Sequence, residues 1–151
     1  MKIRANNLNI IYSKASQKDE IAIINLLKSF GSDKSDFDIN KFYTAKDDKK
    51  IIGCVRIKIL EGDCLELSSL AVDSKYQHQG IGSKLIEKIL IQEQGRPIFL
   101  LTSQNKELFY KKFGFIIIVP RELPSEFKKE YERILALPFS KNLKVIAMVT
   151  K

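Results

Sequence analysis

The chain has 151 residues, of which 44% are hydrophobic, and this is enough apolar surface for the packed core of one domain. The composition excludes a disordered or collagen-like chain, and we expect a single domain over residues 1–151. The formal net charge of +8 predicts an anionic partner, and it leaves nucleic acid, a membrane surface and a phosphorylated small molecule open.

Apolar stretches in the sequence are too short to cross a membrane. No purely apolar run is longer than residues 115–119, which fall far below the ~18 residues that span a bilayer. Asparagines among residues 6–9 stand where a secretory signal needs its apolar stretch, so we expect a cytoplasmic protein that binds no membrane. The two cysteines, Cys54 and Cys64, form no CxxC pair, and His78 is the single histidine. The sequence therefore predicts neither a disulfide scaffold nor a metal site.

The first half of the chain predicts a strand, a helix and three further strands. Residues 9–13 are apolar and β-branched, as in a strand, and Ser16-Gln17-Lys18-Asp19 then resembles the capped start of a helix. The helix face that we expect to be buried carries Ile23, Leu27 and Phe30. Residues 31–40 are polar and predict only a short helical turn. Three apolar runs separated by polar turns then predict an antiparallel meander over residues 42–46, 51–59 and 64–72.

The second half begins with a predicted helix from about Gly80 to near Gly95, and residues 98–101 form a short apolar strand. Strand, helix and strand in this order imply a parallel crossover, and the chain as a whole predicts an α/β fold. The last predicted helix, residues 126–135, alternates Lys with Glu, which predicts a solvent-exposed face of mixed charge. The remaining predicted elements are a helix, a buried strand, this charged helix and a closing strand, over residues 105–113, 115–119, 126–135 and 144–149.

The most informative stretch is a strand that enters a glycine-bearing loop and then a helix. Glycines let a phosphate approach the backbone, and the first N–H groups of a helix have no intrahelical partner, so this order predicts a site for a phosphate ester. A Walker loop would need Gly-Lys-Ser or Gly-Lys-Thr where Gly82-Ser83-Lys84 stands. A dinucleotide fingerprint would need a third glycine where Leu85 stands, so neither common nucleotide motif is present.

The loop pattern Gln77-x-x-Gly80-x-Gly82, after a strand that ends in Leu70-Ala71-Val72, resembles the acetyl-CoA signature of the GCN5-related N-acetyltransferase (GNAT) family. The resemblance continues through Asn105, Phe109-Tyr110 and Gly114-Phe115, in the order of the family, and it covers residues 42–115. It implies the acyl-CoA N-acyltransferase fold. That fold has a mixed central sheet with an antiparallel N-terminal meander, a β-α-β crossover and helices on both faces.

By this resemblance, acetyl-CoA is the cosubstrate and the strand and loop hold it. Backbone groups of Leu70, Ala71 and Val72 would bind the pantetheine arm, which lies along the strand like an added strand, and Asn105 would flank the arm. The pyrophosphate would be bound by backbone N–H groups of Gln77, His78, Gln79, Gly80, Ile81, Gly82 and Ser83. The alternatives are an ordinary helix-entry loop and, for Asn105, a plain helix N-cap.

Two residues match catalytic positions of the family. A primary ammonium with a pKa near 10.4 is a free amine in only about one molecule in 2,500 at pH 7, so the transfer needs a base or a water chain. Glu66 matches the glutamate base of several members, and Leu65 and Leu67 beside it would make its carboxylate more basic. The alternative for Glu66 is a charge on the solvent-facing side of the strand. Tyr110 matches the usual general acid; otherwise it is a tyrosine of an amphipathic helix.

The resemblance implies an N-acetyltransferase that moves an acetyl group directly from acetyl-CoA to a primary amine of a small molecule or a peptide, without a metal. The alternative is a catalytically weak CoA-binding regulatory module; a nucleic-acid-binding protein has only the charge in its favour. Residues 114–124 weakly resemble amino-acid acetyltransferases of the glutamate-acetylating type. Polyamines, protein N-termini, lysines and aminoglycosides remain open as acceptors, and a monomer and a homodimer are both compatible with the sequence.

Overall fold

The structure is a computed structural model and describes residues 9–32 and 34–150. They form two compact units, the first made of the chain up to Ile57 with Ser68–Gln94, and the second of Lys58–Leu67 with the chain from Gly95 onward. The third and fourth strands contribute to both units. A single domain over residues 1–151 stays a prediction. Most of the N-terminal segment that argued against a secretory signal lies outside the described residues.

The strands of the described residues hydrogen-bond in the order β1-β2-β3-β4-β5-β7-β6. Neighbours β1, β2 and β3 are antiparallel, β4 and β5 are parallel, and β7 is antiparallel to both β5 and β6. The predicted mixed sheet with an antiparallel meander and a crossover is therefore confirmed. The strands are β1 (Ile10–Lys14), β2 (Phe42–Asp47), β3 (Lys50–Ile59), β4 (Leu65–Val72), β5 (Ile98–Ser103), β6 (Phe115–Ile118) and β7 (Val145–Thr150).

The α-helices begin and end near the predicted residues, with one exception. They are α1 (Glu20–Ser29), α2 (Ile81–Gln92), α3 (Glu107–Lys111) and α4 (Ser125–Leu135). The exception is α3, which is shorter than the predicted helix because residues 104–106 form a separate 3-10 turn. Within the described part of the chain, no helix combines the length and the apolar character that a membrane crossing requires.

The predicted capping pattern is found one turn before α1, at a 3-10 turn over Gln17–Asp19. Ser16 donates its backbone N–H to Asp19 Oδ2 over 2.8 Å, which closes a capping box. Ile23 and Leu27 are fully buried as expected, but Phe30 is 42% exposed. The reason is that α1 ends at Ser29, and Phe30 at φ −108° no longer follows the helical face.

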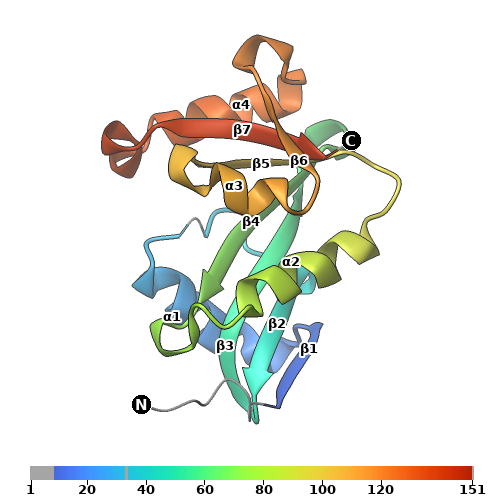
Figure 1. The fold of residues 1–151 in the computed structure, drawn as a ribbon, viewed down its shortest axis with the longest axis vertical. Coiled ribbons are helices and arrows are strands. Elements are labelled where there is room, and N and C mark those ends of the chain that lie inside the picture. Colours follow the sequence, from blue (N-terminus) through green and yellow to red (C-terminus); the bar gives the residue numbers. More distant parts are fainter. Residues whose placement is uncertain (1–8, 33, 151) are drawn as a thin grey trace. The chain divides into compact units, whose positions relative to one another are not determined.

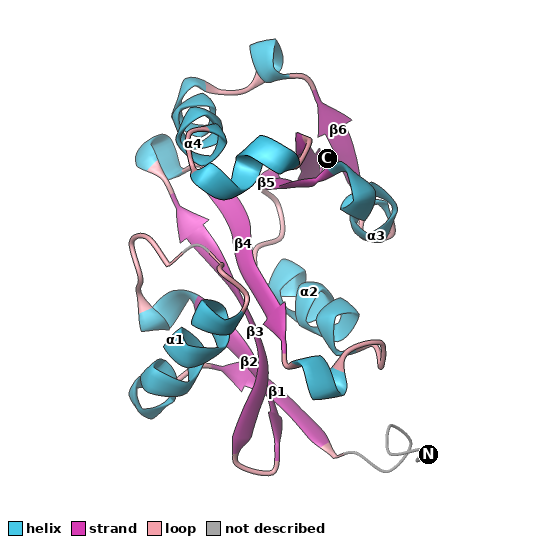
Figure 2. Ribbon diagram, turned by 90° about the vertical axis from the view of Figure 1, so that its left-hand side faces the viewer, coloured by secondary structure: helices cyan, strands magenta, loops and turns pink. Residues whose placement is uncertain are grey.

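In the first unit, α1 and α2 cover opposite faces of the strands (Figure 2). Ile23 and Leu27 of α1 pack with Cys54 of β3 in one core cluster. A Cβ atom built on Gly53, the residue before it, would lie 3.1 Å from Leu85 Cδ1 of α2. Since successive strand residues point to opposite faces, these contacts place the two helices on the two sides, and Gly53 permits the close approach of α2.

In the second unit, α4 packs on one face of the strands, next to β5 and β7 (Figure 1). Phe99 of β5 and Phe127 of α4 lie with ring centroids 5.0 Å apart. β6 is at the edge of the sheet, and its Ile116 and Ile117 are 42% and 45% exposed. The expectation of a buried strand is therefore wrong for these two residues and right for Phe115, because an edge strand has a neighbour on one side only.

Candidate functional site

The loop between β4 and α2 has a backbone suited to an anion. Gly80 precedes the first helical residue and adopts φ +83°, and a Cβ atom built there would meet no atom within 4 Å. The N–H of Lys84 donates to Gly80 O, which is the first bond of the helix. The N–H groups of Ile81, Gly82 and Ser83 precede that bond and have no intrahelical acceptor. The loop therefore presents consecutive donors beside open space at a helix N-terminus, where an anion is favoured.

Contacts within the first unit hold this loop in place. Tyr76 donates its hydroxyl to Asp47 Oδ2 over 2.7 Å, which ties the loop to the end of β2. Gln77 donates its side-chain Nε2 to Val72 O over 2.9 Å. The Val72 carbonyl is thus already engaged by Gln77, and Gln77 has a structural bond in addition to the backbone N–H expected to bind a phosphate.

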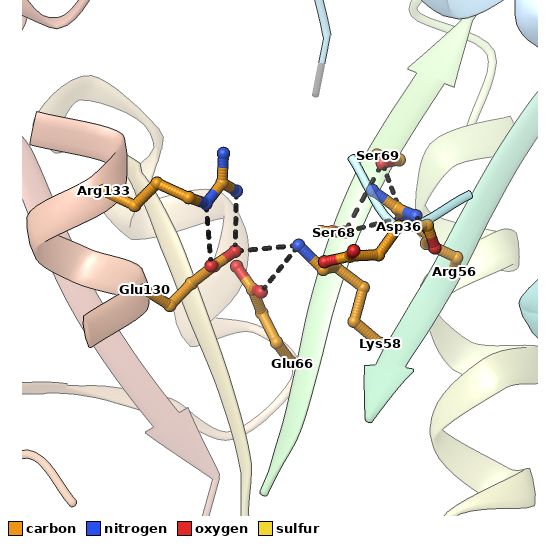
Figure 3. A network of polar contacts seen from close by, with 8 residues as sticks. All are labelled: Asp36, Arg56, Lys58, Glu66, Ser68, Ser69, Glu130 and Arg133. Carbon is orange, nitrogen blue, oxygen red and sulfur yellow. Dashed lines mark hydrogen bonds and ion pairs between the residues drawn. The ribbon is translucent and has the colours of Figure 1, made fainter. Parts of the chain in front are cut away.

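The backbone of β4 is irregular just before the residues predicted to hold the pantetheine arm, and we call this irregularity at Ser69 a bulge. Ser69 has φ +58°, a conformation that an ordinary strand residue does not adopt. Arg56 of β3 donates its Nε to Ser69 Oγ over 2.9 Å (Figure 3). Cys54 Sγ lies 3.5 Å from Ser69 O. Among the described residues, β4 pairs with β5 only through Leu65 and Glu66. Leu70, Ala71 and Val72 therefore lie beyond the bulge and beyond the pairing with β5.

Tyr110 and Asn105 belong to the second unit. The Tyr110 ring packs edge-on against Phe109 and Phe115, with centroids 5.0 and 5.9 Å away. Burial raises the pKa of Tyr110 to about 12, so its phenol keeps its proton at neutral pH. Asn105 is exposed and accepts a hydrogen bond from Ser103 Oγ. It lies within the 3-10 turn and is not the N-cap of α3, which is Lys106.

Glu66 lies in a buried cluster of charges in the second unit (Figure 3). Glu66, a residue of β4, is 3% exposed, and its Oε1 lies 3.8 Å from Lys58 Nζ. Lys58 Nζ also donates to Glu130 Oε2 of α4 over 2.9 Å. Arg133 donates to both carboxylate oxygens of Glu130 over 3.0 Å. The alternative that Glu66 is a solvent-facing charge of the strand is therefore wrong.

Glu130 was not singled out by the sequence, which predicted an exposed helix face of mixed charge. That expectation is wrong for Glu130, which is 7% exposed. Burial acts to raise the pKa of Glu130, but hydrogen bonds from Arg133, Glu66 and Lys58 outweigh burial and lower it to about 2. The alternating charges of the helix gave no signal for this residue, because its partner Lys58 lies 72 positions away in the chain.

The sequence was compared with a family profile and with curated relatives. The sequence profile of the acetyltransferase (GNAT) domain family matches residues 38–117, a little over half of the chain. Two curated relatives named amino-acid acetyltransferase, from Neisseria meningitidis and Pseudomonas fluorescens, are each 32% identical, over 97 and 92 residues. These alignments cover 62% and 58% of this chain. They cover 22% and 21% of the relatives, so the chain spans about a fifth of their length.

Solved structures are similar over nearly the whole chain. N-acetylglutamate synthase from Neisseria gonorrhoeae, complexed with coenzyme A and N-acetyl-glutamate, has a TM-score of 0.75 at 24% identity, with 94% of this chain and 35% of that chain covered. An acetyltransferase of the GNAT family from Staphylococcus aureus has a TM-score of 0.68 at 20% identity, with 94% and 98% covered. These likenesses confirm the predicted fold. Together with the profile match over more than half of its residues, they show that the chain belongs to the GNAT acetyltransferase family.

Proposed function

We propose that the protein is an N-acetyltransferase that transfers the acetyl group of acetyl-CoA directly to the amino group of a small amino acid-like molecule in the cytoplasm. The observation that carries this proposal is the loop at Gly80, with its positive φ and open space before a helix, in a chain of the GNAT family. When bound, acetyl-CoA supplies the acetyl group as a thioester.

The residues of the first unit fit the phosphate and the arm of such a ligand. The free N–H groups at the start of α2 would bind the pyrophosphate, and Leu70 to Val72, which are not paired with β5, would bind the arm through backbone groups. The bulge at Ser69 supports this assignment because it interrupts the regular strand backbone where the arm would begin.

Two residues of the second unit would move protons. Tyr110 holds its proton at neutral pH and none of the described residues hydrogen-bonds with its hydroxyl, so it can donate to the thiolate sulfur that leaves. Glu66 would accept the proton of the acceptor ammonium. Its burial beside Lys58 keeps bulk water away from the carboxyl group, which suits a group that exchanges protons with a bound amine.

An amino acid is the acceptor that the relatives favour. The curated relatives are named amino-acid acetyltransferase, and the synthase from Neisseria gonorrhoeae was solved with N-acetyl-glutamate. A further N-acetylglutamate synthase structure contains coenzyme A and L-arginine. Because the chain covers only about a fifth of the curated relatives, the choice of amino acid is left to experiment.

The test is a thiol-release assay with acetyl-CoA and a panel of the twenty amino acids, polyamines, an aminoglycoside and short peptides. We expect CoA release that depends on an amino acid, with mass spectrometry showing one added acetyl group on its amine. Release with polyamines or peptides alone would contradict the acceptor class. If calorimetry shows CoA binding but no amine gives turnover, the protein is instead the CoA-binding regulatory module.

A further inference from the structure

Arg56 of β3 is a buried cation that contacts β4 within the first unit. It is 1% exposed, and its Cζ lies 5.5 Å from the centroid of the Phe42 ring. Its Nε donates to Ser69 Oγ over 2.9 Å and to Ser68 Oγ over 3.1 Å (Figure 3). Its Nη1 donates to Asp36 O over 3.4 Å. Since a buried charge is costly unless it is hydrogen-bonded, these contacts favour a fixed position of the guanidinium beside β4.

Two of the residues that accept hydrogen bonds from Arg56 have an unusual backbone. Ser69 on β4 has φ +58°, and Asp36, in the segment that precedes β2, has φ +52°. Residues other than glycine rarely adopt positive φ, and they keep it only where the surrounding structure holds them. Serine tolerates this conformation less well than aspartate does. The bulge at Ser69 therefore needs support from its neighbours, and Arg56 supplies a hydrogen bond to it.

Ser69 is also held at its carbonyl group. Cys54 lies two residues before Arg56 on β3, so the two side chains are on the same face of the strand. The Cys54 Sγ lies 3.5 Å from Ser69 O. Burial raises the pKa of the Cys54 thiol to about 12, so the thiol keeps its proton and can donate it in a weak hydrogen bond. Two contacts from β3 thus reach the hydroxyl and the carbonyl of Ser69.

The carbonyl of Ser69 and the N–H of Leu70 belong to one peptide group. A trans peptide group is planar, so its N–H points away from its C=O. A contact that fixes the direction of Ser69 O therefore also fixes the direction of the Leu70 N–H. Leu70 is the first of the residues that would bind the pantetheine arm through backbone groups, and it directly follows the bulge.

We propose that Arg56 is a positioning residue for CoA: together with Cys54 it holds the bulge at Ser69 and so directs the Leu70 N–H toward the pantetheine arm. This role rests on the proposed function, in which Leu70 to Val72 bind that arm. Without Arg56, the backbone at Ser69 would spend more time in the extended conformation that serine favours. Only the molecules that keep the bulge would then bind the arm, and the apparent affinity would fall by that fraction.

The test is calorimetry of the whole chain with CoA and with its nucleotide half, 3′-phospho-ADP, which lacks the pantetheine arm. Ser69→Ala removes the hydroxyl and keeps the Cβ atom that disfavours positive φ. We expect its affinity for CoA to fall by roughly tenfold and its affinity for the nucleotide half to stay unchanged. Arg56→Met should show the same difference between the two ligands. A general loss of structure would instead weaken the binding of both ligands.

Two further variants separate the backbone conformation from the hydroxyl group. Ser69→Gly also removes the hydroxyl, but glycine adopts positive φ readily, so this variant should bind CoA more tightly than Ser69→Ala. Ser68→Ala is the matched control. It removes the neighbouring acceptor of Arg56 Nε at a residue of the described chain that has no positive φ, and CoA affinity should remain close to that of the wild type.

A double-mutant cycle tests whether Arg56 and Ser69 act together. In the Arg56→Met background, Ser69→Ala should cause little further loss of CoA affinity, because both changes remove the same hydrogen bond. Additive losses would overturn the proposal, and so would a Ser69→Gly variant that binds CoA as weakly as Ser69→Ala. Thermal unfolding checks that each variant is folded. Should Arg56→Met not fold, the comparison of Ser69→Ala, Ser69→Gly and Ser68→Ala decides.

The wild type distinguishes a failure of this proposal from a failure of the proposed function. If the wild type binds neither CoA nor the nucleotide half, the proposed function fails, and the role of Arg56 in CoA binding fails with it. If the wild type binds both ligands and Arg56→Met keeps both affinities, only the role of Arg56 is overturned.

Discussion

Tyr110 and Glu130 are both largely removed from water, yet their pKa values move away from the ordinary values for different physical reasons. Around Tyr110 the neighbours are aromatic rings, so burial alone acts and raises its pKa to about 12. Around Glu130 the neighbours are Arg133 and Lys58, whose hydrogen bonds overcome burial and lower its pKa to about 2. The first environment preserves a proton donor, and the second preserves an anion.

Replacing Tyr110 by Phe removes the hydroxyl and leaves the ring packing intact. We expect turnover to fall by about 10²–10⁴-fold while the affinity for acetyl-CoA changes little, because in the proposed function the hydroxyl acts only as the thiolate leaves. Steady-state kinetics and calorimetry measure the two effects. Tyr131→Phe on α4 is the control and should leave both unchanged. If Tyr110→Phe keeps the wild-type turnover under conditions in which acetyl transfer is the rate-limiting step, the general acid is another group.

At the scale of elements, the β4–α2 connection joins a bulged strand end to a helix N-terminus. Gly80 supplies the positive φ that turns the chain into α2. The bulge at Ser69 lies three residues before the last residue of β4, and Arg56 of β3 hydrogen-bonds to the Ser69 side chain. Strand and helix thereby present backbone groups in succession, which is why we expect the ligand to be recognised mainly by the main chain.

A charge introduced into the first turn of α2 should abolish binding of CoA. Gly82→Glu places a side chain and a negative charge among the N–H groups that would bind the pyrophosphate, so we expect calorimetry to show affinity lost by at least 100-fold, about 2.7 kcal/mol. Ser125→Glu makes a similar change in the first turn of α4 and should retain binding. Wild-type affinity in Gly82→Glu would exclude this loop as the pyrophosphate site.

The hydrogen bond from Tyr76 that ties the loop to β2 predicts a smaller effect on CoA binding. Tyr76→Phe removes the hydrogen bond to Asp47, which costs about 0.5–1.5 kcal/mol of unfolding free energy if the bond contributes a typical amount. We also expect severalfold weaker CoA binding, because the loop loses a support. Chemical denaturation and calorimetry measure these changes. Tyr43→Phe on β2 is the control, and equal effects in both variants would show that the Tyr76–Asp47 hydrogen bond does not specifically support the loop.

For the whole molecule, acid should destabilise the fold through Glu130. Its pKa is lowered from 4.5 to about 2 in the folded chain, so its contribution to stability is fully present above pH about 4.5 and is lost as the pH falls through about 2. The net charge of +8 adds growing repulsion over the same range as carboxylates are protonated.

Denaturation midpoints between pH 7 and pH 2 test this dependence. The wild type should lose more unfolding free energy over this range than Glu130→Gln, which starts less stable at pH 7 because Lys58 and Arg133 each lose one anionic partner. Glu132→Gln should follow the wild type. Parallel curves for the wild type and Glu130→Gln would mean that Glu130 is not the anion that the structure describes.

Local signals in the sequence determined most of the secondary structure and the family. The capped turn before α1, the turns of the meander and the glycine loop before α2 depend on neighbouring residues, so they could be predicted without the fold. The order of strand, loop and helix then carried the resemblance to the GNAT family, and the profile match confirmed it. Such features are predictable because caps, turns and hydrophobic periods act within a few residues.

Only the tertiary structure decided which charged and apolar side chains are buried. Glu130 looks like a surface charge in the helix pattern, and for Glu66 a solvent-facing charge was the alternative to a base. Both are buried beside Lys58, which is 72 positions away from Glu130 in the chain. Ile116 and Ile117 look like core residues and remain exposed because β6 has a neighbour on one side only. Burial depends on contacts between elements, and no local pattern encodes which elements will meet.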